Sequence, residues 1–213
     1  PYISQKPGLV GTDSLGYYYT LTALDGKDIY QAALLAKEIN SVRVLYHLTL
    51  YLLRNVSQLS PYVVVELMPI ITIVANALAV FWFVKIGEKS VLMASTAAAF
   101  STFSFTTTIA MHAGMLANWL DMALGFVMFG LLLGLQKKTR LKLLFVAILT
   151  AAVVFLVHYW SGLFFLLVLG CYLLTTLLEQ RNLSFKLAVA AVLVTSAVLA
   201  ALLLSDLALQ LFA

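Results

Sequence analysis

Six long apolar runs between residues 61 and 205 constrain the fold of this chain more than any other feature. Each run is about 18–24 residues long, which is the length of helix that crosses a hydrocarbon layer about 30 Å thick. The runs therefore predict an all-α, polytopic membrane helix bundle with about six transmembrane helices. We place the six helices at 61–84, 91–111, 115–135, 141–158, 161–178 and 187–205.

The overall composition supports a membrane protein. Hydrophobic residues make up 63% of the chain and charged residues only 10%, whereas soluble domains are about 45–50% apolar and about 25% charged. The net charge of +4 is too small to indicate a nucleic-acid partner. The single cysteine, Cys171, has no partner for an internal disulfide and indicates a small residue packed in an apolar run.

The first 60 residues are more polar and form a separate part of the chain. Residues 1–27 are rich in Gly, Pro, Ser, Thr, Tyr and Asp, and predict a loop at the membrane surface. Two short helices follow, one capped by Asp28 and one over residues 41–55. We therefore expect a loop region with juxtamembrane helices at 1–60 and the transmembrane bundle at 61–213. Because the chain begins at Pro1, we also expect either that its original N-terminus was removed or that it is a portion of a longer chain.

The distribution of basic residues predicts the orientation of the bundle. Lys and Arg flank the first, third and fifth connections between the spans, and the second and fourth connections carry none. Basic residues collect on the cytoplasmic side of membrane proteins. We expect an integral protein of the plasma membrane with residues 1–60 on the outer face. The basic residues concerned are Lys85, Lys89, Lys137, Lys138, Arg140, Lys142, Arg181 and Lys186.

The second short helix carries a basic face. Arg43, His47, Tyr51 and Arg54 recur at steps of four, four and three, so they share one side of the helix. An amphipathic helix of this kind lies in the membrane interface. Its basic face either contacts lipid phosphates or a phosphate-bearing substrate, or simply anchors the helix at the headgroups.

Four ionisable residues lie within or at the ends of the predicted spans. Glu66 lines a cavity or reaches back to the headgroups, and Asp121 serves a site or caps its helix. His112 ends a polar stripe in the second span, and His158 ends the fourth span. The topology gathers His112, Asp121 and His158 with Asp13 on one side of the membrane. Such a constellation suits acid/base or metal-assisted chemistry.

The order of these features resembles the GT-C superfamily of integral membrane glycosyltransferases. The resemblance rests on Gly11-Thr12-Asp13 with Tyr17–Tyr19, on the two helices at 28–55, and on the Leu59-Ser60-Pro61 entry to the next span. In that family an acidic motif opens an outer loop, two juxtamembrane helices follow, and a series of spans with short connections comes next. A second acid lies in a later outer loop, in the region that Asp121 occupies here.

The resemblance implies an activity. Members of the family move a sugar from a polyprenyl-phosphate donor to an acceptor at the outer membrane face. Asp13 would be the general base or a metal ligand, and Asp121 would support it or share a divalent cation such as Mg²⁺ or Mn²⁺. The remaining residues expected to contact substrate are Tyr17, Tyr18, Arg43, His47, Glu66, His112 and His158.

Two other classes of function fit the same sequence. A non-catalytic subunit of a membrane-protein complex would use the bundle as a scaffold, with the Ser/Thr-rich second span as a packing face. A transporter would need polar residues across the membrane midplane, whereas the charged residues here lie near the ends of the spans. The expected partners are thus membrane lipids, a polyprenyl-phosphate sugar and, in the scaffold alternative, other membrane proteins.

Overall fold

The computed structural model describes residues 12–40, 43–104, 115–137, 141–179 and 183–212. It confirms the predicted all-helical fold, since this part of the chain contains nine helices and no strand. The N-terminal helices are α1 (Thr12–Leu24), α2 (Ile29–Ile39) and α3 (Val44–Ser57). The apolar helices that follow are α4 (Pro61–Glu88), α5 (Val91–Phe103), α7 (Leu116–Lys137), α8 (Leu141–Val157), α9 (Tyr159–Leu178) and α10 (Leu183–Phe212).

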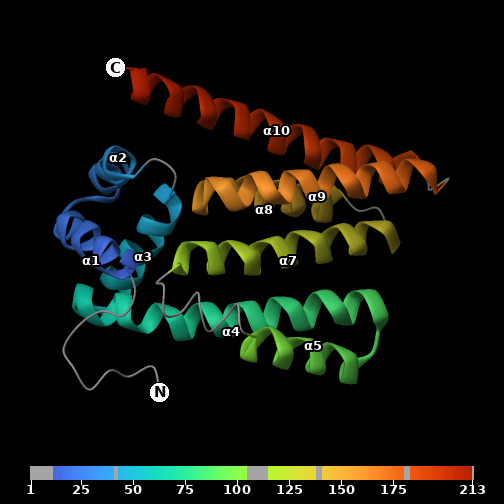
Figure 1. Ribbon diagram of the computed structural model, residues 1–213, viewed down its shortest axis with the longest axis horizontal. Helices are drawn as coiled ribbons and strands as arrows, with labels where there is room; N and C mark the ends of the chain where they lie inside the picture. The colour runs from blue at the N-terminus through green and yellow to red at the C-terminus, as the bar shows by residue number, and fades with distance from the viewer. Residues whose placement is uncertain (1–11, 41–42, 105–114, 138–140, 180–182, 213) are drawn as a thin grey trace.

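The long helices pack side by side as a bundle, and α1, α2 and α3 gather at one end of it (Figure 1). Helix α7 is central, because it packs against α4, α8, α9 and α10. Helix α5 packs along α4. One apolar core joins α7, α8, α9 and α10, and a second core joins α1, α2 and α3 to the near ends of α4, α7 and α8.

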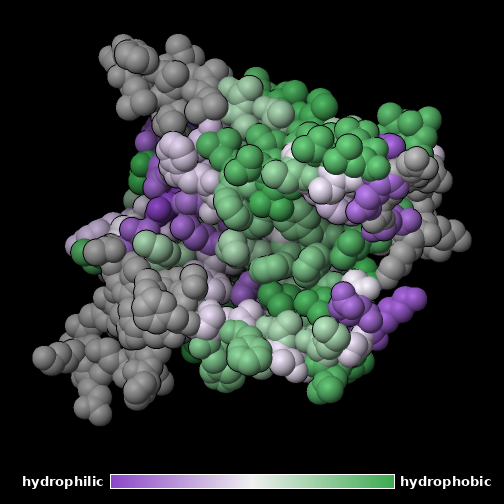
Figure 2. Space-filling model, turned by 45° about the vertical axis from the view of Figure 1, so that its right-hand side comes forward, coloured by the Kyte–Doolittle hydropathy of each residue, from purple (hydrophilic) through white to green (hydrophobic). Residues whose placement is uncertain are grey.

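The apolar helices identify the protein as membrane-embedded. Four of them are long and apolar enough to cross a membrane: α4, α7, α9 and the Leu183–Leu202 part of α10. Helices α5 and α8 are apolar but shorter. Phe100 and Phe103 on α5 are 74% and 83% exposed, as expected for side chains that face lipid. In Figure 2 apolar side chains cover the middle of the visible face, and hydrophilic ones lie toward its two sides.

Four of the predicted spans, 61–84, 115–135, 141–158 and 161–178, match helices of the structure within four residues at each end. The predicted span 187–205 lies inside the longer helix α10. Helix α5 ends at Phe103, because Ser104 has an extended backbone, and residues 105–111 of the predicted span 91–111 lie outside the described residues. On α5 the hydroxyls of Ser101 and Thr102 donate to the Ala98 carbonyl oxygen, at 2.9 and 2.8 Å. These two hydroxyls are therefore satisfied within their own helix.

The prediction of a loop over residues 1–27 is wrong for most of its described part, because residues 12–24 form helix α1. Tyr17, Leu21 and Leu24 recur at steps of four and three and are all buried. Polar and glycine-rich composition favours a loop, but the packing of this face against α3 and α4 outweighs the weak local preference. Gly16 lies on the exposed side of α1.

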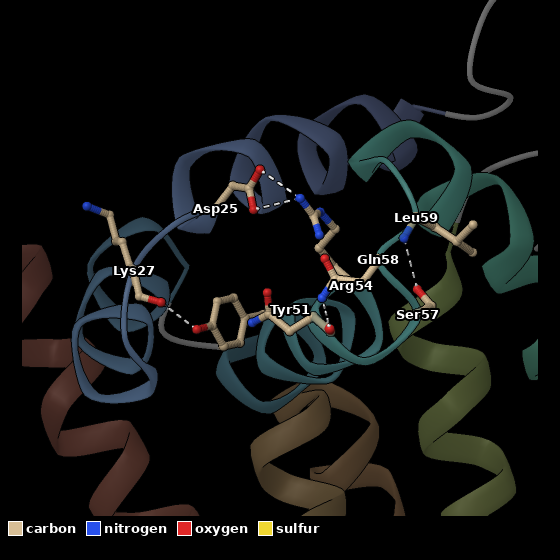
Figure 3. A network of polar contacts seen from close by, with 8 residues as sticks. Asp25, Lys27, Tyr51, Arg54, Ser57, Gln58 and Leu59 are labelled. Atoms are coloured by element: carbon tan, nitrogen blue, oxygen red, sulfur yellow. Dashed lines mark hydrogen bonds and ion pairs between the residues drawn. The ribbon is translucent and has the colours of Figure 1, made fainter.

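Two ion pairs connect α1 to α3. Arg43 contacts Asp13 at 2.8 Å, and Arg54 contacts Asp25 at 3.2 Å. The two acids are 12 positions apart and the two arginines 11, so α1 and α3 run side by side in the same direction. Near the second pair, the Tyr51 hydroxyl donates to the Lys27 carbonyl oxygen at 2.5 Å (Figure 3).

Candidate functional site

A polar cavity of about 250 Å³ lies at the end of the bundle where α1 and α3 meet. Helix α1 contributes one wall and α3, with the residues just before it, contributes another. The polar and aromatic residues that line the cavity are Asp13, Tyr17, Thr20, Asn40, Arg43 and His47. The structure thus brings together four of the residues singled out in the sequence: Asp13, Tyr17, Arg43 and His47. Arg43 and His47 lie at least 26 positions away from Asp13 and Tyr17 in the chain.

Arg43 organises the polar groups of this cavity. Its Nη1 donates to Asp13 Oδ2 at 2.8 Å and to the Tyr17 hydroxyl at 3.0 Å. The guanidinium carbon also lies 5.8 Å from the centroid of the Tyr17 ring, within the range of a cation–π contact. The side chains of Arg43 and Asp13 are 22% and 33% exposed. Water and solutes therefore reach this ion pair.

Tyr17 is the buried centre of the cavity wall. Its ring packs 4.8 Å from Tyr46 and 5.8 Å from His47, centroid to centroid. Burial raises the pKa of Tyr17 to about 12, and the positive charge of Arg43 opposes that rise. The hydroxyl also interacts with the backbone amide of Ala117, at the start of α7. Tyr17 therefore carries a neutral hydroxyl at pH 7 that connects α1, α3 and α7.

His47 is buried and faces inward, in contrast to the predicted basic surface. Its side chain is 2% exposed, and neither ring nitrogen has a hydrogen-bond partner among the described residues. Burial lowers the pKa of His47 to about 4, and the neighbouring Arg43 adds to the effect. The prediction that this face meets the headgroups is wrong for His47 and Tyr51, because both are buried and Leu52, on the other face, is 50% exposed. Helices α1 and α2 pack against this face of α3, so it lies in the interior of the protein.

His158 and Asp121 form a second polar cluster at the same end of the bundle. The backbone N–H of Ser161 donates to Nδ1 of His158 at 3.2 Å, which caps α9, and the Ser161 hydroxyl lies 2.8 Å from the same nitrogen. The pKa of His158 is lowered to about 4, mainly by burial; the charge of Arg43 contributes to the decrease and the charge of Asp13 opposes it. The charged groups of the first cavity, Arg43 and Asp13, therefore also act on His158.

Asp121 lies deeper than its predicted capping position. It is fully buried on α7, beyond the first turn, so the capping alternative is wrong. The Ser161 side chain interacts with its carboxylate, although neither carboxylate oxygen makes a hydrogen bond of normal geometry with a described residue. Asp121 does not line the cavity of Asp13.

The other predicted site residues lie apart from this cavity. Glu66 is half-buried on α4, and Tyr18 lies half-buried on α1 with its ring against Tyr19. His112 lies outside the described residues. Sequence reasoning missed Thr20, Asn40 and Ser161. Thr20 follows Tyr17 by three positions, so it would have been found if α1 had been predicted as a helix.

The divalent cation that the resemblance implies stays a prediction. The Asp13 carboxylate is paired with the Arg43 guanidinium, which occupies the place of a cation. No group of three or more His, Cys, Asp or Glu in the described ranges is close enough to hold a metal. We therefore assign no chemical step to a metal.

Comparisons with protein-family models, with curated proteins and with solved structures found no match for this chain.

Proposed function

We propose that this protein is a GT-C-like glycosyltransferase that moves a sugar from a lipid-phosphate donor to an acceptor at the outer membrane face. The observation that carries the proposal is the cluster of Asp13, Arg43 and Tyr17 in a polar cavity at the end of an apolar helix bundle. A donor with a hydrocarbon tail and a polar head would place its reacting carbon at this level of the membrane. A carboxylate at that level is positioned to serve as a base.

Asp13 is the proposed general base. Its carboxylate takes the proton of an acceptor hydroxyl, and the acceptor oxygen forms a bond to the anomeric carbon of the sugar. The bond from that carbon to the phosphate oxygen breaks, and the lipid phosphate leaves with the bonding electron pair. Attack from the side opposite the phosphate inverts the configuration at the anomeric carbon.

Arg43 is the proposed partner of the leaving phosphate. Guanidinium groups bind phosphate oxygens with charge-assisted hydrogen bonds. The Arg43–Asp13 pair is partly exposed, and pairs of this kind contribute only about 0–1 kcal/mol. A donor phosphate can therefore draw Arg43 away from Asp13 at little cost, which frees the carboxylate to act as a base.

The distribution of charge supports an outer-face site in a plasma membrane protein. Helices α1–α3 gather at one end of the bundle, and the connection between α4 and α5 lies at the other end (Figure 1). Lys85 and Lys89 lie at this second end. By the positive-inside rule it is the cytoplasmic end, and the cavity then opens on the outer face.

The Asp13→Asn variant tests the proposal in proteoliposomes supplied with a polyprenyl-phosphate sugar and a hydroxyl acceptor. We expect transfer to fall by about 10²–10⁴-fold, the usual contribution of a general base. Asp25→Asn is the matched control, because Asp25 belongs to the same region and also pairs with an arginine of α3, outside the cavity. Full transfer by Asp13→Asn, or equal losses in both variants, would contradict the role of Asp13.

A further inference from the structure

An apolar groove of about 480 Å³ lies between α4, α7 and α8. Ala79 of α4 and Ala123 of α7 line the groove and are buried. Leu78 of α4 and Val146 of α8 also line it, and they are 63% and 43% exposed. The small side chains therefore leave a recess between the helices, and this recess opens to the outside of the bundle beside the larger, exposed ones.

The groove lies at the depth of membrane hydrocarbon. Helices α4 and α7 are both long and apolar enough to cross a membrane. On α7 the lining runs from Leu120 to Leu131, which is about 16 Å at 1.5 Å per residue. This length is about half of a hydrocarbon layer about 30 Å thick. The groove begins one turn after Leu116, which packs in the core of α1–α3, so it spans the leaflet on that side.

The width of the groove distinguishes a hydrocarbon chain from a protein helix. A volume of about 480 Å³ over a length of about 16 Å corresponds to a cross-section of about 30 Å². A helix with its side chains is about 10 Å across, so its cross-section is about 80 Å². Carbon atoms of neighbouring molecules lie about 3.5–4 Å apart, so an extended hydrocarbon chain is only about 4–5 Å wide. One such chain fits within the groove, and a second helix does not.

We infer that this groove binds one acyl chain of a bilayer phospholipid, in the leaflet on the side of α1–α3. Inside hydrocarbon no hydrophobic effect brings apolar surfaces together, so packing decides which surfaces associate. An empty recess lacks the dispersion contacts that its lining can make, and a chain of matching width supplies them. The headgroup of this lipid lies near the start of α7. Trp119 is at that level, and tryptophan favours the headgroup region.

The groove is distinct from the cavity proposed for the transfer reaction. No residue in the described part of the chain lines both. A polyprenyl chain carries methyl branches along its length, which make it wider than an acyl chain. We therefore assign the groove to the phospholipid and not to the sugar donor. The inference goes beyond the proposed function and does not depend on it.

Quenching of tryptophan fluorescence by a brominated phospholipid tests the inference, because Trp82 lines the groove. The chain has three tryptophans, so the full chain with Trp119→Phe and Trp160→Phe retains Trp82 alone. This protein is purified in detergent and titrated with a phosphatidylcholine that carries bromine on its acyl chains. We expect the quenching of Trp82 to saturate at one phospholipid per protein. An equal concentration of polyprenyl phosphate should not reverse it.

The Ala123→Phe variant, made in the same background, fills the groove from α7. We expect it to weaken phospholipid binding by at least about tenfold, because its ring occupies the space of the chain. Ala99→Phe is the matched control, because Ala99 is exposed on α5 and does not line the groove. This control should bind as tightly as the parent protein. If circular dichroism shows that Ala123→Phe does not fold, Val146→Phe fills the groove from its exposed side and should also weaken binding.

Three results would overturn the inference. The first is quenching that rises in proportion to the phospholipid concentration without saturation. The second is equal affinity of the parent protein and the folded groove variants. The third is reversal of the quenching by polyprenyl phosphate, which would assign the groove to the sugar donor. Sugar transfer is not measured in this titration, so its outcome is independent of the test of Asp13.

Discussion

At the scale of single residues, surroundings distinguish groups that look alike in the sequence. Asp13 pairs with Arg43 at the start of α3 and Asp25 pairs with Arg54 on α3, but only Asp13 lines the polar cavity. His47 and His158 are both buried, yet His158 caps a helix through Nδ1, whereas His47 has no hydrogen-bond partner among the described residues. Buried groups without partners are costly.

The pKa of His47 predicts how stability depends on pH. The folded state holds this pKa at about 4, below its ordinary value of 6.5, so the proton binds the unfolded chain more tightly. Above about pH 6.5 this group does not change the free energy of unfolding. As the pH falls from 6.5 to 4, protonation of His47 in the unfolded chain lowers that free energy by up to about 3 kcal/mol. We expect His47→Phe to lose less stability than the wild type over that range.

Denaturant unfolding in detergent at pH 7.5, 6, 5 and 4 measures this difference. His158 is present in both proteins, so its own titration cancels in the comparison. Parallel stability curves for wild type and variant would show that His47 is not held neutral by the fold.

At the scale of helices, glycines of α7 set the distance to its neighbours. A Cβ at Gly130 would collide with the ring of Trp82 on α4, and a Cβ at Gly125 would collide with the ring of Phe165 on α9. Small residues allow such close packing between membrane helices, where there is no hydrophobic effect to drive association. The aromatic ring in each case fills the space that a side chain on α7 would need.

Gly130→Ala should therefore destabilise the protein by about 1–3 kcal/mol, the usual cost of overpacking a well-filled site. Gly134→Ala is the control one turn further along α7, because its Cβ would lie 3.9 Å from the nearest atom, Leu143 Cδ1. The control should be neutral or more stable by up to about 1 kcal/mol, since alanine favours a helix over glycine. Unfolding in mixed micelles, followed by tryptophan fluorescence, gives both values. Equal stability of the two variants would contradict the proposed packing.

The sequence predicted the bundle better than it predicted the site, for physical reasons. The length of an apolar run is a local property, so four of the six predicted spans agree with their helices within four residues at each end, whereas 91–111 and 187–205 do not. The pairing of Asp13 with Arg43 joins positions 30 apart and depends on tertiary packing. The failure to predict α1 hid the inward orientation of His47, because no helix was expected to cover it.

At the scale of the whole molecule, the bundle has two chemically different ends. Helices α1–α3 and their ion pairs cover one end, and Lys85 and Lys89 lie at the other, where α4 ends (Figure 1). The surface between them is apolar over much of the face shown in Figure 2. This arrangement fixes the depth of the protein in a membrane, because both ends prefer water and the middle prefers lipid.

The orientation can be tested by labelling in a Cys171→Ser background. Tyr30→Cys places a thiol on the exposed side of α2, where Tyr30 is 71% exposed, and Glu88→Cys places one at the exposed end of α4. We expect a membrane-impermeant maleimide to label Tyr30→Cys on intact cells and Glu88→Cys only after permeabilisation. The reverse pattern would place the cavity in the cytoplasm and would exclude a donor site on the outer face.

The contact between Tyr17 and the start of α7 also has a consequence for biosynthesis. Tyr17 and Ala117 are 100 residues apart in the chain, and at about 5–20 residues per second the ribosome needs about 5–20 s to make the segment between them. During that interval α1 and α3 can already pair through Asp13 and Arg43, but the Ala117 backbone that contacts the Tyr17 hydroxyl does not yet exist. A nascent chain that stalls before residue 117 would therefore insert its first spans without the contact that joins Tyr17 to α7.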